Sequence, residues 1–193
     1  MKSFNFQGFF SKFPNIDLGD IRLRDLSVRD QNNYYQLLSD PEVSKYLSDE
    51  DIPQSVEAAL AEIRFYGSLF YRKQSVFWAI SYGESQELIG TIGFNSWNFH
   101  NRRAEISYDL MSPYFRRGIM TKVLSNVITF GLQKMMLNRI EARTMLDNIA
   151  SCKILEKMNF KQEGVLKSYR IIRGQPTDII LFSLIRQDFH AFL

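Results

Sequence analysis

Residues 103–124, RAEISYDLMSPYFRRGIMTKVL, change from one hydrophobic period to another and so decide the centre of the fold. Apolar and polar residues alternate in Arg103–Leu110, which predicts a strand with one face in the core. After a turn around Pro113, apolar residues recur at helical spacing from Gly118 to about Met136. The sequence therefore predicts a strand, a turn and a long helix.

The segments around this unit predict a mixed sheet. Arg139–Leu146 alternates again, and a strand–helix–strand unit needs a parallel crossover. Two pairs of alternating segments indicate antiparallel hairpins. The hairpins cover residues 76–82 with 87–99, and residues 163–173 with 177–185 around a turn at Gly174–Pro176.

Helices are expected before and after the central unit. Ser27, with Asp30 three residues later, gives a capping signal for one helix, and a second apolar face spans residues 56–71. Asn148 caps a helix that ends where Asn159 supplies a left-handed stop. We therefore expect the α/β class, with one mixed sheet flanked by helices in a single domain over residues 21–193.

The composition limits the classes of function. The chain has 193 residues, of which 45% are hydrophobic and 23% are charged, and a formal net charge of +3, which is typical of one globular domain. The sequence has no basic block, so nucleic acid is not expected as a partner. It also has no run of roughly 18 apolar residues, so a membrane span is not expected. Cys152 is the single cysteine, and His100 and His190 lie far apart, so neither a disulfide nor a metal site is expected. A reducing cytoplasm is the simplest location.

Residues 1–20 form a separate feature because Phe4, Phe6, Phe9, Phe10 and Phe13 fall within them. Polar residues interrupt this series and no small-residue cleavage site follows, which argues against a signal peptide. We interpret the segment as an arm that lays its rings on the domain or on a second subunit of a homodimer. An interfacial membrane helix is the alternative.

The turn before the long helix has the features of an anion-binding site. Gly118 permits close approach, Arg116 and Arg117 lie beside it, and a helix N-terminus presents free N–H groups with partial positive charge. Such a turn suits a pyrophosphate, although it is neither a Walker loop nor a dinucleotide fingerprint. A capped helix with two solvated arginines is equally consistent with these residues.

Eight segments occur in an order that points to one family. They are IRLR at 21–24, DPEV at 40–43, AEISYDL at 104–110, the anion turn, NRIEAR at 138–143, NIAS at 148–151, LEKMNF at 155–160 and EGVL at 163–166. In joint order and spacing they resemble the GCN5-related N-acetyltransferase (GNAT) family, and more closely its RimJ/RimL branch. The resemblance implies a mostly antiparallel sheet that is splayed apart at a cleft for coenzyme A.

The resemblance implies acetyl-CoA as co-substrate. The family's Q/R-x-x-G-x-G/A turn corresponds to residues 115–120, with Phe115 in place of the polar first residue and Met120 in place of the small last one. The pantetheine arm would pair with the splayed strand, where a backbone N–H group stabilises the oxyanion by roughly 3 to 4 kcal/mol. The implied acetyl-CoA-binding residues are Asp109, Leu110, Met111, Phe115, Arg116, Arg117, Gly118, Ile119, Met120, Thr121, Asn148 and Ser151.

Glu105 is the candidate general base. It matches the glutamate in the branch's Ala-Glu-Ile-Gly-Tyr strand, and an ammonium must lose a proton before it attacks. The alternative is an ion pair between Glu105 and Arg103 or Arg143 on a neighbouring strand. Asp109, on the same face of the strand, is a second candidate.

The departing CoA thiolate needs a proton or a hydrogen bond. Many relatives place a tyrosine where this chain has Leu155, so the resemblance assigns this role to Ser151, with Asn148 orienting the pantetheine. Simple capping of a helix is the alternative for both residues. Cys152 has apolar neighbours on its helix and is expected to be a buried, unreactive thiol.

The resemblance implies acetyl transfer from acetyl-CoA to a primary amine by direct attack in a ternary complex. The favoured acceptor is the N-terminal α-amine of a protein, of the ribosomal-protein type. Acetylation of a small-molecule amine such as a polyamine, aminoglycoside or amino sugar is the first alternative. A non-catalytic acyl-CoA-binding module is the second.

Overall fold

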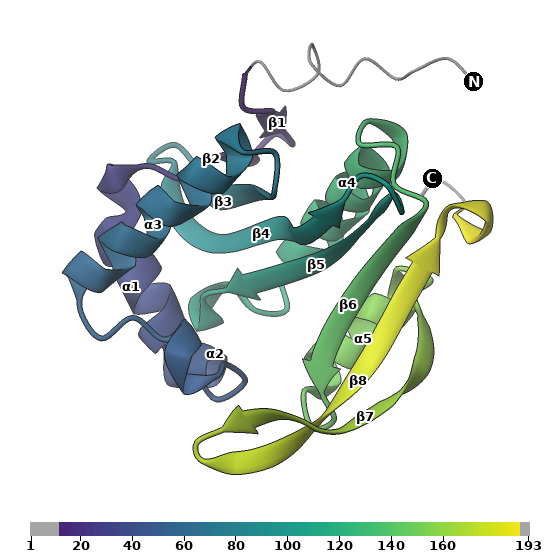
Figure 1. Cartoon of the computed structure of the whole chain (residues 1–193). Coiled ribbons are helices and arrows are strands. Elements are labelled where there is room, and N and C mark those ends of the chain that lie inside the picture. Colours follow the sequence, from purple (N-terminus) through teal and green to yellow (C-terminus); the bar gives the residue numbers. More distant parts are fainter. Residues whose placement is uncertain (1–11, 190–193) are drawn as a thin grey trace.

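The computed structural model describes residues 12–189, and one eight-stranded sheet is its central element (Figure 1). The strand order is β1-β2-β3-β4-β5-β6-β8-β7. The strands are β1 Ile16–Asp17, β2 Ile21–Asp25, β3 Val76–Tyr82, β4 Glu87–Asn98, β5 Arg103–Leu110, β6 Arg139–Met145, β7 Lys161–Ile172 and β8 Gln175–Ile185. The helices are α1 Gln31–Ser39, α2 Pro41–Ser44, α3 Val56–Tyr71, α4 Ile119–Gln133 and α5 Ile149–Lys157, with 3-10 turns η1 Val28–Asp30, η2 Asp49–Asp51, η3 Ser112–Tyr114 and η4 Arg186–Asp188. The predicted α/β class with a mixed, helix-flanked sheet is confirmed.

Strands β5 and β6 form the parallel pair of this sheet, and they pair only at one end. The registered pairs are Arg103 with Arg139, Ala104 with Ile140 and Glu105 with Glu141. Beyond Glu105 the two strands diverge, while β5 stays paired with β4 and β6 with β8 (Figure 1). The crossover and the splayed sheet predicted from the sequence are therefore both present.

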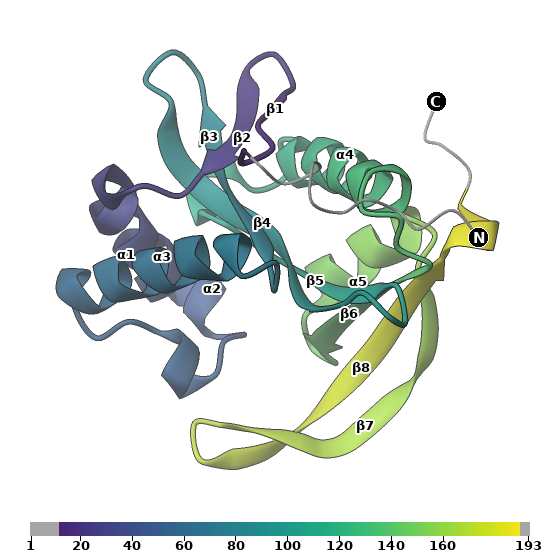
Figure 2. The same ribbon diagram turned by 45° about the horizontal axis from the view of Figure 1, so that its top comes forward.

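Two hydrophobic layers hold helices on opposite faces of the sheet (Figure 2). In β3, Phe77 and Ala79 pack with α1 and α3, whereas Trp78 and Ile80 pack with the layer that contains α4. Because successive residues of a strand point to opposite faces, β3 is apolar on both. Tyr66 of α3 stacks on Phe77 at 4.3 Å between ring centroids. The two layers therefore hold α1–α3 on one face of the sheet and α4–α5 on the other, at the part of the sheet where β5 and β6 diverge.

The element boundaries agree with the sequence except at two turns. The closing hairpin turns at Arg173–Gly174, both at positive φ (50° and 71°), and not at Gly174–Pro176. A two-residue turn of this kind matches the twist of its strands, and Pro176 is tolerated because β8 has only β7 as a neighbour there. Helix α4 ends at Gln133, before the predicted Met136, whose φ of 56° is left-handed.

The described part of the N-terminal segment contacts the domain. The ring of Phe13 lies 5.0 Å from that of Phe70 and 6.0 Å from that of Trp78, and Trp78 Nε1 donates to the carbonyl of Pro14 at 2.6 Å. Phe4, Phe6, Phe9 and Phe10 lie outside the described residues. Across residues 12–189, no helix combines the length and the apolar character that a membrane crossing requires.

Candidate active site

Two cavities meet where β5 separates from β6. The first, here called the strand cavity, encloses about 550 Å³ over Glu105, Ser107 and Asp109 of β5. The second, here called the turn groove, encloses about 610 Å³ beside Gly118 at the start of α4. Both are lined by Tyr46, Tyr108, Asp109, Asn148 and Ser151. A molecule in one cavity can therefore meet a molecule in the other at these residues.

The turn groove has the form of a polyphosphate site. Gly118 is the N-cap of α4 at φ 75°, and no heavy atom lies within 4 Å of the position that a Cβ would occupy. The first-turn N–H groups of α4 have no intrahelical acceptors and open onto this space. Its charged residues are mostly basic: Lys45, Arg116, Arg117, Lys153 and Lys157, against Glu42 and Asp109. These residues fit the pyrophosphate of coenzyme A.

Residues that depart from the family turn do not close the groove. Met120 packs in part against the hydrophobic core and Ile119 is buried beneath the helix, and both line the groove without closing it. Phe115 is 40% exposed on the rim. Thr121 is half-buried and completes the lining.

The end of β5 presents backbone groups to the cleft. Met111 N–H donates to the Ile89 carbonyl at 2.8 Å, so this N–H is used within the sheet. Backbone groups of successive strand residues point to alternate neighbours, so those of Leu110 point toward the side from which β6 has diverged. Gly90 lies directly against this segment, because a Cβ there would be 2.4 Å from the carbonyl oxygen of Asp109.

Ser151 lies in a pair of hydroxyls that the sequence did not reveal. Its Oγ is 2.9 Å from the hydroxyl of Tyr108, and its N–H donates to Asn148 Oδ1 at 3.1 Å. Asn148 therefore caps α5, as the alternative interpretation expected. Burial raises the pKa of Tyr108, so its hydroxyl stays protonated and can donate. Tyr108 was overlooked because it belongs to the apolar face of its strand, although a buried tyrosine hydroxyl usually has a polar partner.

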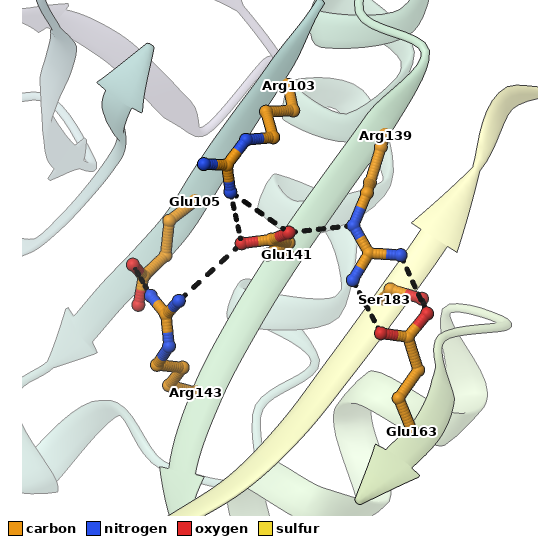
Figure 3. Close-up of polar contacts among 7 residues, drawn as sticks. All are labelled: Arg103, Glu105, Arg139, Glu141, Arg143, Glu163 and Ser183. Atoms are coloured by element: carbon orange, nitrogen blue, oxygen red, sulfur yellow. Dashed lines mark hydrogen bonds and ion pairs between the residues drawn. The ribbon is translucent and has the colours of Figure 1, made fainter. Parts of the chain in front are cut away.

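Glu105 forms an ion pair with Arg143 of β6 (Figure 3). Of the two arginines considered from the sequence, Arg103 instead contacts Glu141, at 3.3 Å. Burial raises the pKa of Glu105, and the charges of Arg143 and Arg170 act against this rise. Glu105 thus faces the strand cavity with its charge balanced by a neighbour.

The ion pair is one end of a charged network across four strands (Figure 3). Glu141 contacts Arg103, Arg139 and Arg143, and it is only 10% exposed. Arg139 continues to Glu163 of β7 at 2.5 Å, and Glu163 also accepts a hydrogen bond from a β8 serine. The network lies at the end of β5 and β6 where these strands still pair.

Asp109 differs from Glu105 in having no cation beside it. Within residues 12–189 its carboxylate takes part in no ion pair closer than 4 Å. Burial raises its pKa from 3.8 to about 6, and the charge of Asp51 adds to the rise. Nearby, Tyr34 donates to Glu62 at 3.1 Å, so one further carboxylate of the cavity is held by a hydroxyl.

Two other residues considered in the sequence, Cys152 and Leu155, lie on α5. Cys152 is half-buried and not buried as predicted, but desolvation raises its pKa, which keeps the thiol protonated. Leu155, at the position where many relatives have a tyrosine, is fully buried. Among the described residues, no three His, Cys, Asp or Glu side chains lie together in an arrangement that could hold a metal ion.

Comparison with known proteins identifies the family. Residues 20–161 match the family model described as an acetyltransferase (GNAT) domain. The chain is 34% identical over 174 residues to the uncharacterized N-acetyltransferase YoaA of Bacillus subtilis (90% of this chain and 98% of that protein). It is 27% identical over 123 residues to the ribosomal protein uS5-alanine N-acetyltransferase of Escherichia coli, covering 62% of each. The structure of RimL, a ribosomal L7/L12 α-N-protein acetyltransferase in complex with coenzyme A, superposes with a TM-score of 0.81 at 21% identity (89% of this chain and 98% of that chain).

The chain therefore belongs to the GNAT family, in its RimJ/RimL-like branch. It is an acetyl-CoA-dependent N-acetyltransferase.

Proposed function

We propose that this enzyme acetylates the N-terminal α-amine of a protein, of the ribosomal-protein type. The observation that carries the proposal is the junction of the strand cavity with the turn groove at Tyr108, Asp109 and Ser151. An amine entering from one side meets a thioester entering from the other. Glu50, Asp51 and Phe65 at the outer part of the strand cavity are exposed, which leaves a path for the rest of a peptide.

Different residues would bind the phosphates, stabilise the oxyanion and supply the proton in a direct transfer of the acetyl group. Acetyl-CoA supplies the thioester that the amine attacks. The α4 N-terminus with Arg116 and Arg117 binds phosphate, and the Leu110 N–H group, directed into the cleft, stabilises the oxyanion. Ser151 donates a proton to the CoA thiolate, and the Tyr108 hydroxyl 2.9 Å away replenishes it.

The ammonium of the acceptor must also lose a proton. Two carboxylates of β5, Glu105 and Asp109, face the strand cavity. Either reaches the amine directly or through one water molecule, which is sufficient for general base catalysis.

A small cationic amine is the second candidate acceptor. The strand cavity combines the aromatic rings of Tyr34, Tyr66 and Phe77 with the carboxylates of Glu62 and Asp109. Aromatic faces and carboxylates both attract ammonium groups, so a polyamine also suits this lining. The single cysteine supports a cytoplasmic location for either acceptor.

An acceptor panel tests the proposal. It contains peptides that begin with serine or alanine, the same peptides blocked at the α-amine, a polyamine and an aminoglycoside. We expect acetylation of the unblocked peptides only. Acetylation of the polyamine with the peptides left unmodified contradicts the proposed acceptor, and coenzyme A binding without any turnover supports a binding module.

Two variants test the proton donors. Ser151→Ala and Tyr108→Phe should each lower kcat by roughly 10²-fold or more, with the Kd of acetyl-CoA unchanged. Cys152→Ala, one residue along α5, is the matched control and should leave kcat unaltered. A variant that weakens acetyl-CoA binding and leaves kcat intact would instead assign a binding role to its hydroxyl.

A further inference from the structure

The two carboxylates of β5 have different charge environments although they share a face of one strand. Glu105 is 17% exposed and is paired with Arg143, which also approaches Glu141 and lies 5.6 Å from the ring of Tyr169. Burial raises the pKa of Glu105, and the Arg143 guanidinium opposes this rise because it favours the charged form of the carboxylate. Arg143 therefore works against proton transfer to Glu105.

Asp109 lies four residues nearer the open end of the cleft. It lines both cavities, whereas Glu105 lines the strand cavity alone. Tyr108, which contacts Ser151, precedes Asp109 in the strand and points to the opposite face, but Asp109 and Ser151 both line the two cavities. An amine that attacks a thioester at the junction is closer to Asp109 along the strand than to Glu105.

Among residues 12–189, no cation that lines the two cavities forms an ion pair with Asp109. Lys45 pairs with Glu42 at 2.7 Å, and Arg143 pairs with Glu105 and Glu141. The other titratable groups of the strand cavity are Tyr34 of α1, Tyr46 after α2, Glu50 and Asp51 of η2, Glu62 and Tyr66 of α3, Glu105 and Tyr108 of β5, Arg143 of β6 and Arg170 of β7. Those found in the turn groove alone are Glu42 and Lys45 at α2, Tyr114, Arg116 and Arg117 before α4, and Lys153 and Lys157 of α5. The counterion of Asp109 is then the ammonium of the acceptor.

We propose that Asp109 is the catalytic base of this acetyltransferase and that Glu105 is a positioning residue held by Arg143. The proposal rests on the proposed chemistry of amine acetylation, but not on which amine is used. The ammonium gives one proton to the Asp109 carboxylate, and its nitrogen forms a bond with the carbonyl carbon of the thioester. Collapse of the oxyanion breaks the carbon–sulfur bond and releases the CoA thiolate. The nitrogen loses a second proton and the thiolate gains one, so these two transfers cancel. Asp109 then releases its proton to solvent.

The electrostatics of the site agree with this role. Burial and the charge of Asp51 raise the pKa of Asp109 to about 6, close to the range in which a base is most effective near neutral pH. A base must be deprotonated, so kcat/KM should rise with pH through about 6.

Three variants test the assignment with the acceptor that the panel identifies. Asp109→Asn should lower kcat by roughly 10²- to 10⁴-fold and remove the limb near pH 6, with the Kd of acetyl-CoA unchanged. Glu105→Gln should keep this limb, and Asp51→Asn should move it to lower pH. An Asp109→Asn enzyme that keeps the limb, or a Glu105→Gln enzyme that loses it, overturns the proposal.

A titration of the free enzyme, which needs no acceptor, tests the assignment of Asp109 separately from the proposed peptide acceptor. Carbon NMR of the aspartate carboxyls in the free enzyme, assigned with Asp109→Asn, should show one carboxyl that titrates at about 6. Titration of Asp109 below about 4.5 refutes the base assignment whichever amine is acetylated. Failure of the peptides as substrates, with this titration present, refutes only the proposed acceptor.

Discussion

Replacement of Asp109 by asparagine should stabilise the fold above pH 6 while it removes activity. The pKa of Asp109 rises from 3.8 to about 6, and each unit corresponds to about 1.4 kcal/mol, so the buried charge costs about 3 kcal/mol at pH 8. Because the pKa is raised in the folded state, this group makes the free energy of unfolding fall as pH increases from about 4 to about 6. The variant lacks that decrease. Since its amide also loses hydration, we expect a net gain of about 1 to 3 kcal/mol, or about 2 to 4 °C in Tm per kcal/mol.

Urea unfolding of both proteins at pH 4.5, 6 and 8 measures this effect. The difference in unfolding free energy should be smallest at pH 4.5 and largest at pH 8. Asp178→Asn is the control, because Asp178 is half-buried and accepts hydrogen bonds from Lys167 and the Ser168 N–H, which lower its pKa. That control should lose stability at pH 8. An Asp109→Asn protein that is less stable than the parent at pH 8, or equally pH-dependent, would refute the reasoning.

Three further substitutions test the surroundings of the site. Glu141→Gln should destabilise the fold by about 3 kcal/mol in urea unfolding, because it leaves three arginines without their shared carboxylate, and a loss below about 1 kcal/mol contradicts the network. Glu163→Gln should lower the free energy of unfolding by less than about 1 kcal/mol, because Glu163 is 39% exposed. Arg139 lowers the pKa of Glu163 to about 2, so the stability that this ion pair contributes is present at neutral pH and is lost as pH falls toward 2. Gly118→Ala should cost about 1 kcal/mol through its φ of 75° and weaken acetyl-CoA binding in calorimetry, and unchanged affinity would show that the backbone of this turn does not bind phosphate.

Periodicity predicted the centre of the fold because β5 and α4 each bury one regular face. The alternation in Arg103–Leu110 and the helical spacing after Gly118 are local signals, and the crossover rule then requires β5 and β6 to be parallel. The turn at Arg173–Gly174 was misplaced because glycine and proline occur together, and both residue types mark turns. Which of them lies in the turn is decided by the twist of the paired strands.

The functional pairs were harder to predict because they join distant segments. Glu105 was identified on the strand, but its choice of Arg143 over Arg103 depends on where β6 lies beside β5. The contact between Tyr108 and Ser151 spans 43 residues and depends on the packing of α5. Burial of Asp109 also depends on η2 and α3, so its raised pKa cannot be derived from neighbouring residues in the chain.

The divergence of β5 from β6 gives this sheet two edges in its interior. Most sheets expose edges only at their outer strands, where charges, prolines or short strands discourage pairing with other chains. Here the facing sides of β5 and β6 must stay open to a ligand and cannot be blunted in that way. The fold shields them by the divergence of the strands and by helices on both faces (Figure 2). We therefore expect acetyl-CoA to suppress aggregation during mild heating more than its effect on Tm alone would predict, which light scattering measures directly.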